Sequence, residues 1–129
     1  MDESPLIISY TRAMAIADGV FVDIMAGPHA HLVREAGIRW PVALTSAAYA
    51  EVVALTEAAE AAGCDEAGRL WDLLSVFHFA AKRSEGNEVH FSVVAVTTGP
   101  KAVTVDLWAV VEPDEDGTPA ITIMLEGED

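Results

Sequence analysis

DEAGRLWDLLSVFHFAAKR, residues 65–83, carries the clearest secondary-structure pattern of the chain. Its large apolar residues recur at intervals of three and four, so they share one face of an α-helix. Asp65 is placed to cap the start of this helix, and Lys82 and Arg83 match the negative end of the helix dipole. The stretch therefore predicts a long helix with one buried face. That face consists of Leu70, Leu73, Leu74, Phe77, Ala80 and Ala81.

The last third of the chain alternates apolar and polar residues with a period of two, which is typical of β-strands. Residues 89–96, 103–111 and 121–125 predict three strands, with turns at residues 99–101 and 113–117. Because the turns are short, consecutive strands are expected to be antiparallel neighbours. The three strands therefore predict a meander with one apolar face that needs a cover.

A second long helix, over residues 45–62, is expected to complete this cover, with Thr45 or Ser46 as its cap and no proline or glycine inside it. Shorter elements are predicted before it: strands at residues 6–10 and 20–24, helices at residues 11–18 and 29–36, and an extended segment at residues 38–44. Pro41 places that segment at a sheet edge or in a connector. The predicted fold class is α+β, as one domain over residues 1–129. Short N-terminal strands and helices precede two longer central helices, which pack on a C-terminal three-stranded antiparallel meander.

The charge of the chain excludes several classes of partner. It has 7 Lys and Arg against 21 Asp and Glu, a formal net charge of −14, while 52% of its residues are hydrophobic and argue for a packed core. We expect no direct binding to nucleic acid or to an anionic membrane surface, since both require basic residues. The chain also shows no apolar run near the ~20 residues that span a bilayer, and no basic secretory signal. We therefore expect a cytoplasmic protein.

The acidic residues gather after the last basic residue, Lys101, and 7 of the 21 lie within the last 18 residues. Such a concentration of charge can steer a basic partner into contact. We predict an acidic face that binds a basic protein surface by imitating the spacing of phosphates, and the alternative is acidity that serves solubility alone. The predicted face consists of Glu112, Asp114, Glu115, Asp116, Glu126, Glu128 and Asp129.

The sequence predicts no catalytic residue, no metal site and no cofactor. It has no nucleophile elbow, P-loop or dinucleotide-binding glycine motif. His29 and His31 have the H-x-H form, but residues two apart on a helix point about 200° away from each other. Cys64 is the only cysteine, which excludes an intramolecular disulfide and a multi-cysteine zinc site.

Two alternatives to the acidic interaction surface remain open. One is a small enzyme or ligand-binding domain with a cleft near Tyr10, Arg12 and Trp40, where the arginine would hold an anionic group. The other is a homodimeric structural protein joined through the meander edge or the long helices. We also expect Arg69 and Asp72, three residues apart on the predicted helix, to form an ion pair.

Short stretches over most of the chain carry a family resemblance. They are YTRA at residues 10–13, IADG at 16–19, REAG at 34–37, PVALT at 41–45, GRLWD at 68–72 and PAITIML at 119–125. Together they resemble an uncharacterised family of small proteins carried on bacterial plasmids and phages. The resemblance implies no activity, but it implies an accessory protein of a mobile element. Combined with the charge, it suggests an inhibitor of a host defence complex, of the anti-CRISPR or anti-restriction type.

Overall fold

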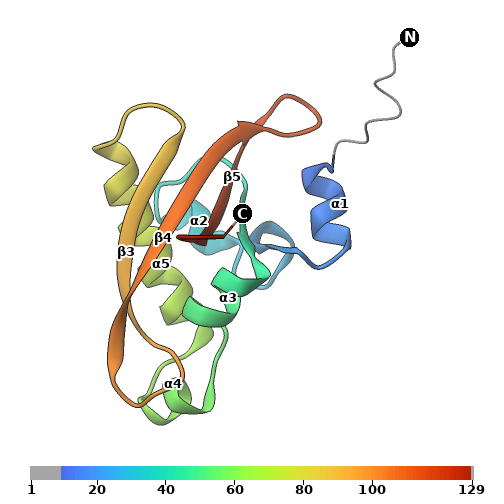
Figure 1. Ribbon diagram of the computed structural model, residues 1–129. Helices are drawn as coiled ribbons and strands as arrows, with labels where there is room; N and C mark the ends of the chain where they lie inside the picture. Colours follow the sequence, from blue (N-terminus) through green and yellow to red (C-terminus); the bar gives the residue numbers. More distant parts are fainter. Residues whose placement is uncertain (1–9, 129) are drawn as a thin grey trace.

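A five-stranded mixed sheet lies at the centre of the computed structural model, which describes residues 10–128 (Figure 1). The strand order is β1-β2-β5-β4-β3; β2 runs parallel to β5, and the other neighbours are antiparallel. The strands are β1 (Phe21–Asp23), β2 (Val42–Thr45), β3 (Glu88–Val96), β4 (Ala102–Pro113) and β5 (Pro119–Leu125). The helices are α1 (Arg12–Ala17), the short 3-10 helix η2 (Ile24–Ala26), α2 (His31–Glu35), α3 (Ser46–Val52), α4 (Glu57–Ala61) and α5 (Glu66–Lys82). The predicted α+β class is confirmed.

Helix α5 confirms the prediction from residues 65–83. The Asp65 side chain accepts a hydrogen bond from the Gly68 amide and caps the first turn. The ring of Phe77 lies 5.7 Å from that of Phe91 on β3, between their centroids, so the apolar face of α5 packs on the sheet. Its buried residues are Arg69, Leu70, Leu73, Leu74 and Phe77.

The prediction of one helix over residues 45–62 is wrong, because the chain forms α3 and α4 with a break between them. At the break, the backbone carbonyls of Glu51 and Val53 accept hydrogen bonds from the Arg69 side chain on α5, at 3.0 and 3.2 Å. The chain leaves the helix at Val53, where φ is −121°. Thr56 then starts α4 by accepting a hydrogen bond from the Ala59 amide.

The three-stranded meander is only part of the sheet. β3, β4 and β5 are consecutive antiparallel neighbours, but the sheet continues through β2 and β1. The expectation of a connector or edge strand at residues 38–44 is wrong, since β2 lies between β1 and β5. Pro41 is tolerated because it precedes the strand and contributes only its carbonyl, which accepts from the Ile121 amide at 2.8 Å.

The N-terminal predictions are confirmed in outline. The helix at residues 11–18 is α1, the strand at 20–24 is β1, and the helix at 29–36 is the shorter α2. The strand predicted at residues 6–10 lies outside the described residues, apart from Tyr10, which precedes α1 without strand structure. Within residues 10–128, no helix is both long enough and apolar enough to cross a membrane.

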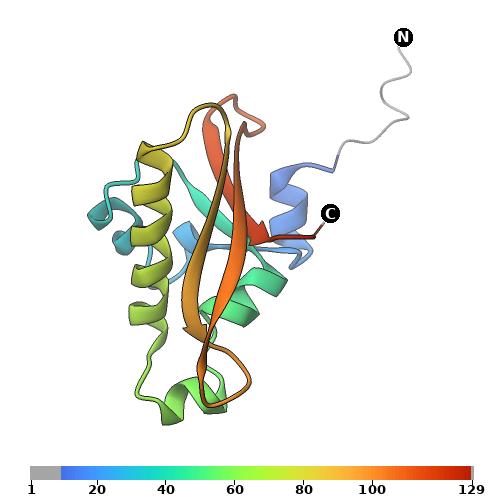
Figure 2. The ribbon, with the colours of Figure 1, turned by 60° about the vertical axis from the view of Figure 1, so that its left-hand side comes forward.

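The two faces of the sheet have different surroundings. α5 packs on one face, whereas α1 stands beside the opposite face near β1 (Figure 2). On that second face, which we call the open face, cross-strand pairing forms a row over all five strands. The row consists of Glu88, Val110, Thr122, Ala43 and Asp23. A neighbouring row contains His90, Trp108 and Met124.

Candidate functional site

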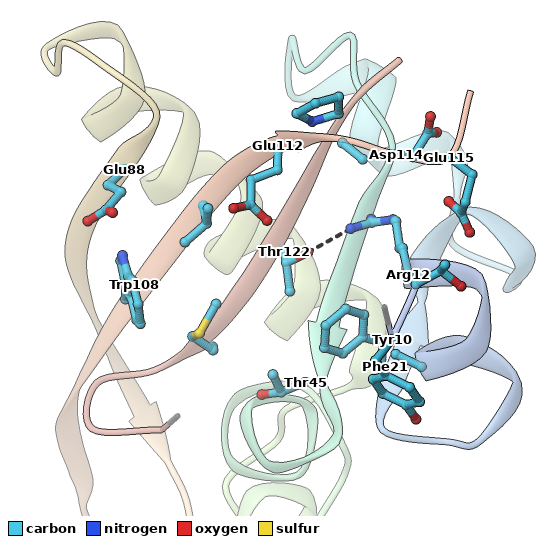
Figure 3. A pocket seen from close by; sticks show the side chains of 16 residues that line it. Tyr10, Arg12, Phe21, Thr45, Glu88, Trp108, Glu112, Asp114, Glu115 and Thr122 are labelled. Atoms are coloured by element: carbon cyan, nitrogen blue, oxygen red, sulfur yellow. Dashed lines mark hydrogen bonds between the residues drawn. The ribbon is translucent and has the colours of Figure 1, made fainter. Parts of the chain in front are cut away.

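The open face is hollowed into a cavity of about 650 Å³ (Figure 3). Trp108 and Val110 of β4 and Thr122 and Met124 of β5 form its floor. The start of α1 forms one wall, and the β4–β5 connection, residues 114–118, borders the cavity through Asp114 and Glu115. Known ligand pockets have volumes of about 300–1,000 Å³, so the cavity is large enough for a side chain or a small molecule.

Arg12 fastens α1 to the sheet. Its Nη1 donates to Thr122 Oγ1 at 2.6 Å, and its Nη2 donates to the Ile121 carbonyl at 2.9 Å (Figure 3). Burial lowers the pKa of the Arg12 guanidinium, and the nearby carboxylates of Asp23, Asp114 and Glu115 oppose that shift. The guanidinium is thus engaged in holding a wall of the cavity in place.

Two acids of the β4–β5 connection also have structural contacts. Asp114 Oδ1 accepts from the backbone amides of Asp116 and Thr118, at 2.9 and 3.0 Å, and so shapes the turn. Glu115 Oε2 accepts from the Ala13 amide at 2.9 Å and ties the connection to α1. Hydrogen bonds from its own backbone amide and from that of Ala13 lower the pKa of Glu115.

The acids at the end of the chain approach the open face from its other end. Glu126 contacts Nδ1 of His90, whose ring stacks on Trp108 with 5.9 Å between the ring centroids and 3° between the planes. Glu128 Oε2 accepts from Thr45 Oγ1 at 2.8 Å and from the Leu125 amide at 2.7 Å. Both carboxylates therefore contact residues at or beside the cavity floor.

The structure brings most of the predicted acidic face together around the open face. Glu112, Asp114 and Glu115 line the cavity, and Asp116 lies in the adjoining turn. Glu126 and Glu128 reach the same face by the contacts just described. Asp129 lies outside the described residues.

The predicted ligand cleft is brought together only in part. Tyr10 and Arg12 line the cavity, and the Tyr10 hydroxyl donates to Asp18 Oδ2 at 2.7 Å, a bond that raises the pKa of the tyrosine. Trp40 is not among the residues that line the cavity; it is 39% exposed and lies before β2.

Glu88 and Trp108 line the cavity although the sequence analysis did not select them. Both occupy positions of β3 and β4 that alternate with the buried residues, so the period-two pattern places them on the polar face. That pattern is the signal that identifies them, but it becomes specific only with the strand pairing.

The predicted ion pair between Arg69 and Asp72 is wrong. Arg69 is only 7% exposed, and it donates to three backbone carbonyls. The acceptors are the carbonyls of Val53 at 3.2 Å, Val96 at 2.7 Å and Glu51 at 3.0 Å. Asp72 is exposed and makes no ion pair with Arg69. The buried Arg69 side chain therefore links α5 to the end of α3 and to the end of β3 through hydrogen bonds.

Ion pairs are scarce in the described part of the chain. Within residues 10–128, the only side chains that approach a carboxylate as ion-pair partners are His29 and His90. His29 Nε2 lies 3.9 Å from Glu66 Oε1, whereas His31 is exposed at the start of α2. The same residues contain no group of three or more His, Cys, Asp or Glu side chains placed to hold a metal ion.

These observations define an α+β domain with α5 packed on one sheet face and an acid-lined cavity on the other. The chain belongs to a family of unknown function, DUF6573, whose family model matches residues 1–129. The expected membership of an uncharacterised family is thus confirmed, while the plasmid or phage setting stays a prediction. Searches of curated proteins and of solved structures found no match.

Proposed function

We propose that the protein is a non-enzymatic interaction domain that binds a basic protein segment through the cavity on its open face. The observation that carries the proposal is the lining of that cavity, which combines an apolar and aromatic floor with four carboxylates and one cation. The carboxylates are those of Glu88, Glu112, Asp114 and Glu115, and the cation is Arg12. Because Arg12 is engaged with β5, the net charge presented to a partner is negative.

Of the four lining carboxylates, those of Glu88 and Glu112 make the fewest contacts with other residues of the protein. Glu88 has only a 3.9 Å contact with His90, and Glu112 accepts no hydrogen bond from another described side chain. Both side chains are exposed. They are therefore available to pair with positive charges of a partner, and long-range attraction adds to the rate of encounter.

The partner proposed here is a basic surface of a nucleic-acid-binding protein, including components of a host defence complex. Surfaces that bind phosphates carry dense lysine and arginine, which an acid-lined cavity would complement. This choice of partner is supported by the net charge of −14 and by the gathering of acids around one face.

Fluorescence anisotropy with a labelled oligo-arginine peptide tests the proposal. We expect binding at low salt that weakens strongly as the Debye length falls from about 10 Å at 0.1 M to about 3 Å at 1 M. The variant Glu112→Gln should bind more weakly than Glu60→Gln, which removes the same charge from α4, away from the cavity. If the affinity for the peptide changes neither with salt concentration nor in Glu112→Gln, the proposal is wrong.

A small-molecule site is the second candidate, and the cavity volume of about 650 Å³ is the observation that favours it. A thermal-shift screen with nucleotides, nicotinamide cofactors and divalent ions tests it. A ligand at 100 times its dissociation constant stabilises a protein by about 2.7 kcal/mol, which such a screen detects. Light scattering on the free protein tests the third alternative, self-association through the edge strand β3.

A further inference from the structure

We infer that the cavity holds an arginine side chain of the partner in preference to lysine, with the guanidinium between Glu88 and Glu112. The inference rests on the proposed function and adds the identity of the recognised side chain. It follows from three features of the cavity: the spacing of these two carboxylates, the unpaired N–H group of the Trp108 indole, and the position of Arg12.

The two carboxylates stand on neighbouring strands. Glu88 pairs directly with Val110, and Glu112 follows Val110 by two residues, so both glutamates point to the open face as diagonal neighbours. Such neighbours are about 7–8 Å apart at Cα, a distance that long side chains can bridge. Figure 3 shows the two side chains projecting on the same side of the cavity as Trp108.

A guanidinium fits this arrangement better than an ammonium. Its five N–H donors lie in one plane and point along different edges, so it can donate to a carboxylate on each side. The lysine ammonium is a point charge with three donors and a tighter hydration shell, and it gains less from two separated acceptors. We therefore expect the pair of glutamates to distinguish two side chains of equal charge.

The Trp108 indole supplies an independent sign of a missing partner. Its Nε1 atom is buried, and no hydrogen-bond acceptor lies within reach among the described residues. A buried donor without an acceptor is unfavourable, so an acceptor brought by a partner would be stabilising. The ring nitrogen lies at the end of the indole nearer to Glu88, whose side chain is exposed (Figure 3). A backbone carbonyl next to the bound arginine is an acceptor of the required kind.

Arg12 determines which end of the cavity receives the cation. It occupies the α1 side through its bonds to Thr122 and the Ile121 carbonyl. The carboxylates beside it, Asp114 and Glu115, already accept hydrogen bonds from backbone amides and are less available to a second cation. The Trp108 end carries Glu88 and Glu112 without a basic lining residue. The partner arginine is thus directed to the end where the unpaired indole donor lies.

The test compares two peptides that are identical except for one central basic residue, arginine in one and lysine in the other. Each is titrated into isotopically labelled full-length protein and followed by NMR, with the Trp108 indole signal assigned from Trp108→Phe. We expect the arginine peptide to bind about tenfold more tightly and to shift the indole N–H signal downfield. Glu112→Gln and Glu88→Gln should each remove most of this preference, whereas Glu60→Gln should retain it.

The outcomes separate this inference from the proposed function. Equal binding of the two peptides, or an unmoved Trp108 signal at saturation, would overturn the inference; the proposed function stands in either case if binding remains sensitive to salt and to Glu112→Gln. If neither peptide binds and oligo-arginine does not bind either, the proposed function itself is wrong. Circular dichroism of each variant confirms that the comparison is made between folded proteins.

Discussion

Replacement of Arg69 by methionine is predicted to destabilise the protein more than any other change of a basic residue. The Arg69 side chain donates from Nε, Nη1 and Nη2 to three backbone carbonyls. Two of these carbonyls belong to the C-terminal end of α3, and the third belongs to the end of β3. The guanidinium therefore compensates the negative end of the α3 dipole and joins segments far apart in the chain.

The size of the effect follows from these three bonds. Each hydrogen bond to a charged group contributes about 1.5–3 kcal/mol, and the methionine would leave three carbonyls without this donor. Relief from burying the charge offsets part of the loss, and each buried carbonyl left without a donor costs about 1–3 kcal/mol. We expect the free energy of unfolding to fall by about 3–4 kcal/mol. That is a large part of the ~5–15 kcal/mol that stabilises a typical domain.

Urea unfolding followed by circular dichroism measures this change. With a slope of about 2 kcal/mol per M, the midpoint of Arg69→Met should fall by roughly 1.5–2 M. Arg83→Met is the matched control, because Arg83 is exposed and lies over the Phe79 ring at 5.1 Å. Its effect should stay below about 1 kcal/mol. Arg69→Lys, which keeps the charge but loses the fork of donors, should lie between the two. Equal midpoints for Arg69→Met and Arg83→Met would show that the three hydrogen bonds of Arg69 do not stabilise the fold.

Three further predictions concern the walls and turns around the cavity. Arg12→Met should release α1 and speed hydrogen exchange over residues 11–18, with a loss of about 1–2 kcal/mol in unfolding free energy; unchanged exchange would contradict the role of Arg12 as an anchor. Since hydrogen bonds lower the pKa of Glu115 in the folded state, protection of the Ala13 amide should persist above the ordinary carboxyl pKa of about 4.3. It should be lost as the pH falls below that value, and Glu115→Gln should abolish this pH dependence in exchange measured by NMR. Gly37→Ala should lower the thermal midpoint by an amount equivalent to about 1–2 kcal/mol or more, because φ is +93° and the new Cβ would lie 2.9 Å from a histidine nitrogen. Gly99→Ala, with open space around it, should leave the midpoint nearly unchanged.

The elements that the sequence predicts well are those determined by nearby residues. α5 follows from a local apolar stripe and an adjacent cap, and β3 to β5 follow from alternation and short turns. The break between α3 and α4 lies instead where the carbonyls of Glu51 and Val53 accept hydrogen bonds from Arg69, a tertiary contact that the local sequence does not indicate. The parallel pairing of β2 with β5 joins segments about 80 residues apart, and no local pattern in either strand indicates it.

The sequence indicates the acidic character of the cavity but not the full set of residues that line it. The sequence indicates the acids of the β4–β5 connection and the pair Tyr10 and Arg12, because they are unusual in their local surroundings. It does not indicate that Glu88 approaches Glu112, since that proximity depends on the register of β3 against β4. Trp40 is the opposite case, because the sequence predicts it at the cleft but it does not line the cavity.

The structure also bears on whether the acidity of the chain serves solubility alone. Solubility requires only that charge be spread over the surface, as the acids of α4 and α5 are. It does not require that carboxylates surround a floor containing Trp108 and Met124, with a buried indole N–H that lacks an acceptor. Aromatic and methionine side chains are enriched where proteins meet partners. The proposed binding of a basic group accounts for this combination of an apolar floor with an acidic border, which solubility alone does not require.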